Sequence, residues 1–70
     1  MFSIVLRNAA ATRRYSITPH ADAGWEVVLE RDGELPQRVR YHDWHRVERT
    51  LAIFRLEVSE LTARGWQVVH

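Results

Sequence analysis

The residues best suited to chemistry in this sequence are its four histidines, of which His42 and His45 form an H-x-x-H pattern. In a sheet, His20 and His42 are expected to approach Gly24 from either side, with Asp22 nearby. Two histidines and a carboxylate are a ligand set that metal ions use. However, two strands of separation place the two histidines roughly 9–10 Å apart, which is too far for one ion. We therefore expect solvent-exposed histidines, with no metal ion and no cofactor.

Other catalytic groups are equally poorly placed. The three serines fall in regular elements, without a Gly-rich turn or a neighbouring base. The paired carboxylates, Glu26 with Glu30 and Glu57 with Glu60, share their surfaces with arginines. The chain has no cysteine, which excludes thiolate chemistry, disulfides and Cys-based zinc sites. Since 70 residues leave little room for a deep pocket, the sequence predicts a protein that is not an enzyme.

All ten basic residues are arginine, and the formal net charge is +1. Arginine suits bidentate contacts to phosphate and carboxylate groups, although so small a net charge argues against strong non-specific binding to nucleic acid. Five arginines are expected on the outer face of a sheet or at its edge, and a sixth lies in the first turn of a helix, where an anion can bind. These candidate nucleic-acid or anion-binding residues are Arg7, Arg13, Arg14, Arg38, Arg40 and Arg46.

The stretch from Asp43 to Gly65 has the periodicity of one long amphipathic helix. Its apolar residues recur at alternating steps of three and four, which places them within an arc of about 100°. Asp43 suits the N-cap, and Gly65 suits the left-handed position after the last turn. Trp66 would then fold back on Leu61. The core-facing residues of this helix are Trp44, Val47, Leu51, Phe54, Val58 and Leu61.

Two apolar residues, Ile53 and Leu56, lie far round the helix from this face. Scattered aliphatic side chains are common on protein surfaces, so one interpretation leaves both simply exposed. The other interpretation is a second contact face, where small neighbours let another helix approach closely, and it predicts a homodimer. The residues of this predicted interface are Ala52, Ile53, Leu56, Ser59 and Ala63.

Four stretches before the helix alternate apolar and polar residues, as strands do. The predicted strands are residues 2–7, 14–18, 25–30 and 35–41. Residues 8–13 are expected to form a loop, although their alanines could also form a helical turn, and residues 20–24 are expected to form a turn. Pro19 either ends the second strand or confines it to an edge, and Asp32-Gly33 marks another turn. Val68 and Val69 would add a short fifth strand or seal the core.

Side-chain parity predicts the register. Directly opposed residues of an antiparallel pair share a face, so a two-residue Asp-Gly loop would bring arginines onto the core face and should be disfavoured. A three-residue loop, or a bulge near Pro36, instead places the apolar residues of both strands on the same face. The resulting pairs are Val27 with Val39, Trp25 with Tyr41, Glu26 with Arg40, Ile17 with Val27, Tyr15 with Leu29, and Arg14 with Glu30.

The predicted fold class is α+β: residues 1–70 form a single small domain, in which a four-stranded antiparallel β-meander packs on one long C-terminal helix (ββββα). A chain this short buries only about 60% of its unfolded surface, so self-association would add stability. No run of about 18 apolar residues and no signal-peptide pattern occurs. We therefore expect a soluble, cytoplasmic protein without a membrane partner.

The predicted function is a small non-enzymatic binding or regulatory module, a homodimer with a macromolecular partner such as another protein. The alternative is a domain that binds single-stranded DNA or RNA through the arginine-bearing sheet face. A ββββα unit that dimerises through its helix is similar in topology to Whirly-type and coactivator-type single-strand-binding proteins, which implies that alternative. Against it, the predicted aromatic residues point inward, whereas single-strand binders stack bases on exposed aromatics. Glu26 and Glu30 also dilute the basic patch.

Overall fold

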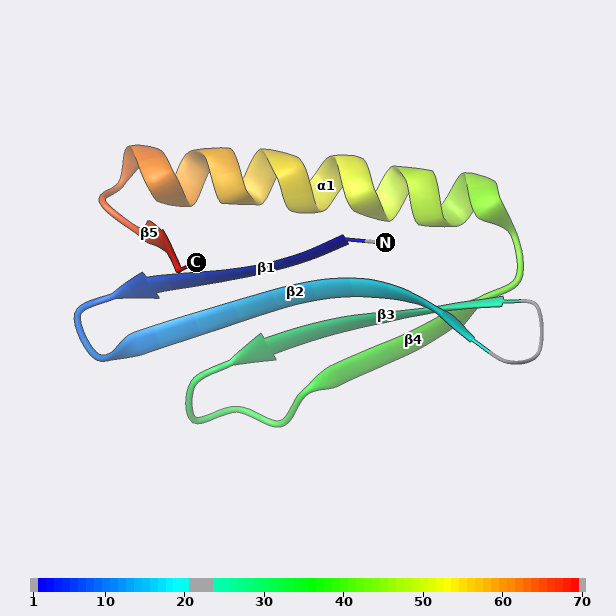
Figure 1. Cartoon of the computed structure of the whole chain (residues 1–70), viewed down its shortest axis with the longest axis horizontal. Helices are drawn as coiled ribbons and strands as arrows, with labels where there is room; N and C mark the ends of the chain where they lie inside the picture. Colours follow the sequence, from blue (N-terminus) through cyan, green and yellow to red (C-terminus); the bar gives the residue numbers. More distant parts are fainter. Residues whose placement is uncertain (1, 21–23, 70) are drawn as a thin grey trace.

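The computed structural model describes residues 2–20 and 24–69, which form an antiparallel sheet packed against one helix (Figure 1). The elements in chain order are β1 (Phe2–Asn8), β2 (Ala11–His20), β3 (Gly24–Arg31), β4 (Gln37–Tyr41), α1 (Trp44–Ala63) and β5 (Gln67–Val69). The strands are arranged in the order β4-β3-β2-β1-β5. The α+β prediction is confirmed, and the residues after the helix do form a short fifth strand on β1. The helix that the described residues form is not long and apolar enough to cross a membrane.

The register predicted from parity is confirmed throughout. Val27 lies opposite both Ile17 and Val39, and Trp25 lies opposite Tyr41. The connection between β3 and β4 occupies residues 32–36, which is longer than the predicted three-residue loop but places the same side chains on the same face. The apolar side chains of β2, β3 and β4 therefore share the inner face, which we define as the face toward α1.

The predicted loop at residues 8–13 is wrong, and of the two alternatives predicted for Pro19 the edge position is the one confirmed. Residues 8–13 are not a loop, because β1 and β2 pair as far as Asn8 opposite Ala11 and only two alanines connect them. Nor does Pro19 end the second strand, since it pairs with Trp25 within β2. The pairing of β1 with β2 extends only to Ile17, so Pro19 lies where β2 has no described β1 neighbour. Its missing N–H is tolerated there as it is at a sheet edge.

The helix ends are those that the sequence predicts. The Asp43 carboxylate accepts a hydrogen bond of 3.0 Å from the His45 backbone N–H, as an N-cap should. At the other end Arg64 is the C-cap, and Gly65 adopts a φ of 102°. The Trp66 N–H donates to the Leu61 carbonyl at 3.0 Å, which completes a Schellman ending. This ending folds Trp66 back toward the sheet.

The core lies between α1 and the inner face of the sheet. Tyr15 and Phe54 are in aromatic contact there, with ring centroids 4.8 Å apart. Trp44, predicted to face the core, stays half-exposed and packs on Trp25 at 5.1 Å. The buried residues of this core are Leu6, Tyr15, Ile17, Val27, Val47, Phe54 and Leu61.

One helix is too narrow to cover this sheet. Five strands spaced about 4.8 Å apart extend about 19 Å from the first to the last, whereas a helix with its side chains is about 10–12 Å across. The consequence is visible on β4, where the inward-facing Val39 remains 46% exposed. Part of the inner face is therefore left without a covering element among the described residues.

Candidate functional site

The outer face of the sheet, on the side away from α1, carries four of the six candidate arginines. Arg7 comes from β1, Arg14 from β2, and Arg38 and Arg40 from β4. They stand on alternate positions of their strands, which directs them to one side of the sheet. The prediction that these four share the outer face is borne out by the register.

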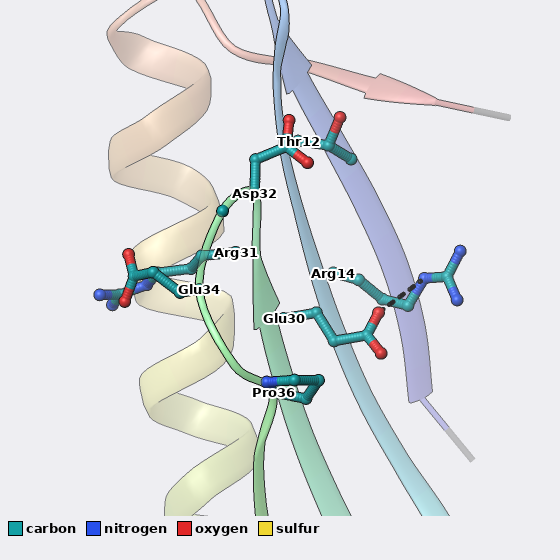
Figure 2. A pocket seen from close by; sticks show the side chains of 8 residues that line it. Thr12, Arg14, Glu30, Arg31, Asp32, Glu34 and Pro36 are labelled. Atoms are coloured by element: carbon teal, nitrogen blue, oxygen red, sulfur yellow. Dashed lines mark ion pairs between the residues drawn. The ribbon is translucent and has the colours of Figure 1, made fainter.

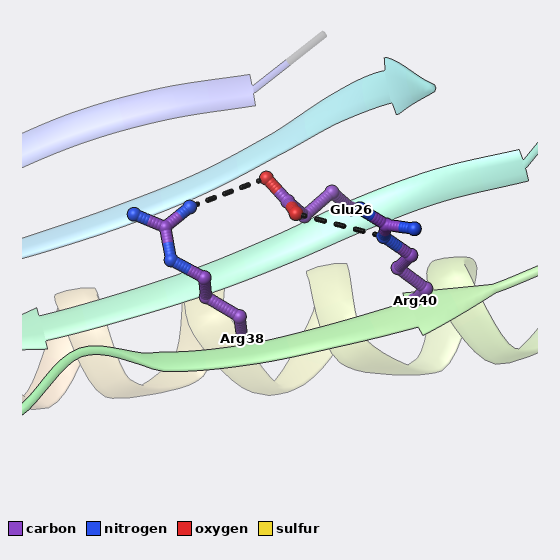
Figure 3. Close-up of polar contacts among 3 residues, drawn as sticks. All are labelled: Glu26, Arg38 and Arg40. Atoms are coloured by element: carbon purple, nitrogen blue, oxygen red, sulfur yellow. Dashed lines mark hydrogen bonds and ion pairs between the residues drawn. The ribbon is translucent and has the colours of Figure 1, made fainter. Parts of the chain in front are cut away.

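Glutamates from β3 are paired with three of these arginines. Glu26 lies between Arg38, at 3.4 Å, and Arg40, at 3.8 Å (Figure 3). Glu30 is 3.7 Å from Arg14 (Figure 2). The three arginines are more than half exposed, whereas the Glu26 side chain is 22% exposed, and pairs of this kind near the surface are worth about 1 kcal/mol each. A phosphate group could displace such a carboxylate at little cost in stability.

A hollow of about 320 Å³ opens beside this pairing, next to the β3–β4 connection (Figure 2). Its wall contains both signs of charge: Arg14 and Glu30 lie on one side of it, and Arg31 and Glu34 lie on the other (Figure 2). Arg14 and Glu30 are already paired with each other, so the outer-face part of this hollow gives no preference for an anionic or a cationic ligand.

Val28 shows what the arginines do for the outer face. It alternates with Glu26 and Glu30 and so points away from the helix, yet it is only 7% exposed. Arg38 lies directly opposite Val28 and reaches back across it to Glu26. The aliphatic stem of an arginine covers apolar surface in this way while its guanidinium stays in water. Sequence alternation alone did not indicate that this position is buried.

The placement of Arg13 on the outer face or its edge was wrong. Arg13 lies opposite Leu6 and Arg31, in step with the inward-facing Tyr15, and therefore belongs to the inner face. Its guanidinium carbon is 5.2 Å from the centre of the Trp66 ring, within cation–π range. The folding back of Trp66 at the helix end provides this neighbour, which strand periodicity alone does not reveal.

Arg46 is also separate from the outer-face arginines. It occupies the first turn of α1, where its backbone N–H donates to the Asp43 carbonyl, and its side chain is exposed on the helix. The six candidate arginines thus divide into a group of four on the outer face, Arg13 on the inner face, and Arg46 on the helix. No single surface brings all six together.

The far side of α1 contains the predicted dimer residues. Ile53 is 56% exposed and Leu56 is 61% exposed. At 100° per residue, Leu56 lies within about 60° of all three small residues of the predicted interface, whereas Ile53 lies towards one flank. All five predicted residues, Ala52, Ile53, Leu56, Ser59 and Ala63, are exposed in the structure.

A polar cluster on the inner face was not predicted. The Tyr15 hydroxyl and the Arg31 Nε are buried and have no hydrogen-bond partner within residues 2–20 and 24–69. Burial raises the pKa of Tyr15 above its usual value, the Arg13 guanidinium opposes this change, and the negative charge of Glu57 adds to it. The only sequence signal for this cluster was that Arg13 and Arg31 share the parity of Tyr15 and Leu29.

The histidine arrangement is partly as expected. His20 lies opposite Gly24, and a Cβ atom on Gly24 would be 3.0 Å from His42 Nδ1 and 2.8 Å from the Tyr41 carbonyl oxygen. Asp22, the expected carboxylate, lies outside the described residues. Within the described ranges no group of three or more His, Asp or Glu side chains is arranged to hold a metal ion.

The chain matches no protein-family model, and neither a curated protein nor a solved structure shows significant similarity to it. The functional argument therefore rests on the surfaces described above.

Proposed function

We propose that the protein is a cytoplasmic, non-enzymatic interaction module that acts as a homodimer through the far side of α1. The observation that supports this function is the exposure of Leu56, at 61%, and Ile53, at 56%, on the helix side that the sheet does not cover. Large apolar side chains grouped on one face are typical of interaction surfaces. Ala52, Ser59 and Ala63 around Leu56 leave room for a second helix to approach closely.

Charge complementarity favours a second copy of this chain, packed antiparallel. Arg49 and Glu60 lie on the same flank of Leu56, about 20° and 40° round the helix. If a two-fold axis passes by Leu56, Arg49 lies about 10.5 Å from it and Glu60 about 6 Å in the other direction. The antiparallel partner then places its Glu60 within about 4.5 Å of Arg49 along the axis, twice per dimer. A parallel pair would instead set Arg49 level with the partner's Arg49.

The expected affinity follows from the size of this surface. Full burial of an isoleucine or leucine contributes about 1.5–3 kcal/mol, so two residues from each copy give roughly 6–12 kcal/mol. Association itself costs about 4–15 kcal/mol. The two amounts are similar, and we therefore expect a weak, concentration-dependent dimer rather than an obligate one.

The test is molar mass in solution by light scattering over a range of protein concentrations. We expect the wild-type mass to rise toward that of a dimer and to change little with salt, because apolar contacts dominate. Leu56→Glu should keep the protein monomeric with an unchanged circular dichroism spectrum. Glu48→Arg, a charge reversal on the other flank of the helix, is the matched control and should still dimerise. A wild-type protein that stays monomeric at every concentration would contradict the proposal.

A second candidate function, binding of single-stranded nucleic acid, is supported by the surplus of arginine on the outer face. Four arginines stand there against two glutamates, and the three ion pairs are exposed enough to be exchanged for phosphate contacts. The same light-scattering experiment with a short oligonucleotide tests this candidate. Phosphate-driven binding must weaken steeply as salt rises, and it should be lost in Arg38→Gln with Arg40→Gln but retained in Leu56→Glu.

A further inference from the structure

The polar cluster on the inner face lies at the end of the sheet where the β1–β2, β3–β4 and α1–β5 turns come together (Figure 1). Tyr15 Oη and Arg31 Nε are the two buried side-chain polar atoms of the described residues that have no hydrogen-bond partner. They occupy neighbouring strands, since Arg31 lies opposite Arg13 and Tyr15 follows Arg13 on the same face. Buried polar groups in folded proteins are nearly always hydrogen-bonded. Arg13 and Glu57 lie close enough to the Tyr15 hydroxyl to change its pKa, so Arg31 Nε is the atom that indicates a missing acceptor.

The charges at this end point to the chemistry of that acceptor. Arg13 and Arg31 are directly opposed on β2 and β3, and like charges in opposed positions destabilise a sheet. Neither guanidinium forms an ion pair with a carboxylate of the described residues. A guanidinium offers five N–H donors in a rigid fork that matches the oxygens of carboxylate and phosphate groups. An oxyanion would relieve the repulsion and accept hydrogen bonds from both residues.

We propose that Arg13 and Arg31 form a binding site for a single oxyanion group, a phosphate or a carboxylate, in the hollow that they share with Trp66. This hollow has a volume of about 160 Å³, which is several times the roughly 30 Å³ that one water molecule occupies in the liquid. The Trp66 ring lies 5.2 Å from the Arg13 guanidinium carbon and limits how that group can move. The site is thus held on one side by the helix end and on the other by the sheet.

Two carboxylates also line the hollow, and they are the internal competitors for the arginines. Asp32 and Glu34 belong to the β3–β4 connection, and Figure 2 shows Glu34 on the same side of the sheet as Arg31. Two backbone hydrogen bonds fix this segment. The Asp32 N–H donates to the Thr12 carbonyl at 3.1 Å, and the Glu34 N–H donates to the Arg31 carbonyl at 3.1 Å. With the segment fixed in this way, neither carboxylate reaches ion-pair distance.

Tyr15 lies next to Arg13 on the inner face, outside the residues that line the hollow. It is fully buried, and burial raises the pKa of its phenol. The hydroxyl therefore keeps its proton at neutral pH and can donate a hydrogen bond into the cluster. Glu57 on α1 is the carboxylate whose negative charge also raises the pKa of this hydroxyl. The groups that would hold an anion in the hollow are therefore the two guanidinium groups, and Tyr15 contributes only as a neighbour of Arg13.

The experiment is a titration of the full-length, ¹⁵N-labelled protein with inorganic phosphate, at constant ionic strength maintained with chloride. We expect saturable chemical-shift changes at the Nε–H groups of Arg13 and Arg31 and at the Trp66 indole N–H, with dissociation in the millimolar range typical of one oxyanion. A parallel titration with acetate distinguishes phosphate from carboxylate as the preferred group. Arg55→Gln, a change at an exposed arginine of α1 that does not line the hollow, is the matched control and should bind phosphate as the wild type does.

Variants of the site sharpen the outcome. Arg31→Gln should weaken phosphate binding by about tenfold or more, because hydrogen bonds to charged groups are the strong ones. Arg31→Lys keeps the positive charge and the fold but lacks the planar guanidinium with its paired N–H donors, so it should bind phosphate with intermediate affinity. Glu34→Gln should bind more tightly, since a competing negative charge is removed. Shifts that are not saturable, or that are the same in Arg31→Gln, would overturn the proposal. So would an Arg31 Nε–H already protected from exchange without phosphate, because an internal carboxylate would then be its partner.

Discussion

Tyr15 is the residue at which this small fold holds a polar group without a partner. Its ring packs on Phe54 at 4.8 Å, and its hydroxyl is buried and unbonded among the described residues. An unsatisfied buried group costs about 1–3 kcal/mol. Tyr15→Phe keeps the ring and removes that cost, so we expect the free energy of unfolding at pH 7 to rise by about 1 kcal/mol. Urea denaturation in chloride buffer measures this change in the free energy of unfolding. A Tyr15→Phe protein less stable than the wild type would show that the hydroxyl has a hydrogen-bond partner.

The same residue predicts how stability depends on alkaline pH. Burial raises the pKa of Tyr15 in the folded state, so the native protein holds this proton where the unfolded chain, with a pKa of about 10, releases it. The stability from this residue is therefore fully present below about pH 10 and is lost as the pH rises through the folded-state pKa. Tyr15→Phe should show a shallower alkaline loss than the wild type, whereas Tyr41→Phe, which retains Tyr15, should not. Equal alkaline slopes for wild type and Tyr15→Phe would contradict this account.

At the scale of single elements, the β1–β2 turn is the least favourable piece of backbone. Ala9 adopts a φ of 52°, in the left-handed region that costs a residue with a Cβ about 1–2 kcal/mol. We expect Ala9→Gly to raise the free energy of unfolding by about 0.5–1 kcal/mol, since glycine enters this region without that penalty. Ala10→Gly is the matched control: its φ is not positive, so added chain entropy should make it neutral or destabilising. Thermal unfolding of both variants and of the wild type measures these differences in stability.

The elements that the sequence predicted correctly are those with strong local signals. The inner-face position of Val39, like that of Val27, follows from the two-residue period of strands, because a register slip of one residue would bring arginines to the core face. The helix ends follow from Asp43 and Gly65, whose side-chain chemistry suits those two positions. The Ala9–Ala10 turn escaped prediction because alanine gives no turn signal.

The parts that were missed depend on contacts between elements. Arg13 is in step with Tyr15 on the inner face, but its cation–π neighbour, Trp66, comes from the end of α1. Val28 is buried because Arg38, on the next strand, reaches across it to Glu26. Neither effect is contained in the periodicity of one segment. The orphaned atoms of Tyr15 and Arg31 likewise arise only when β2, β3 and α1 are assembled.

At the scale of the whole molecule, the mismatch between one helix and five strands leaves apolar surface on both layers. Val39 is exposed on the sheet, and Ile53 and Leu56 are exposed on the helix. A 70-residue chain buries only about 60% of its unfolded surface, so association is an efficient way to gain stability. Self-association through α1 would also leave the outer-face arginines and the Arg13–Arg31 cluster open to other ligands.

The antiparallel geometry proposed for this association can be tested separately from dimerisation itself. In that geometry Arg49 meets the partner's Glu60 twice, so Arg49→Glu and Glu60→Arg should each create two like-charge contacts. At roughly 0.5–1 kcal/mol per exposed pair, each single variant should raise the dimer dissociation constant by about fivefold to tenfold or more. The double variant Arg49→Glu with Glu60→Arg restores opposite charges and should recover dimerisation, as sedimentation equilibrium would show. If Leu56→Glu abolishes the dimer but neither charge variant weakens it, the interface lies on this helix face, but the two helices are not antiparallel. Recovery in the double variant alone would establish that these two side chains meet across the interface, because no effect within one helix produces that pattern.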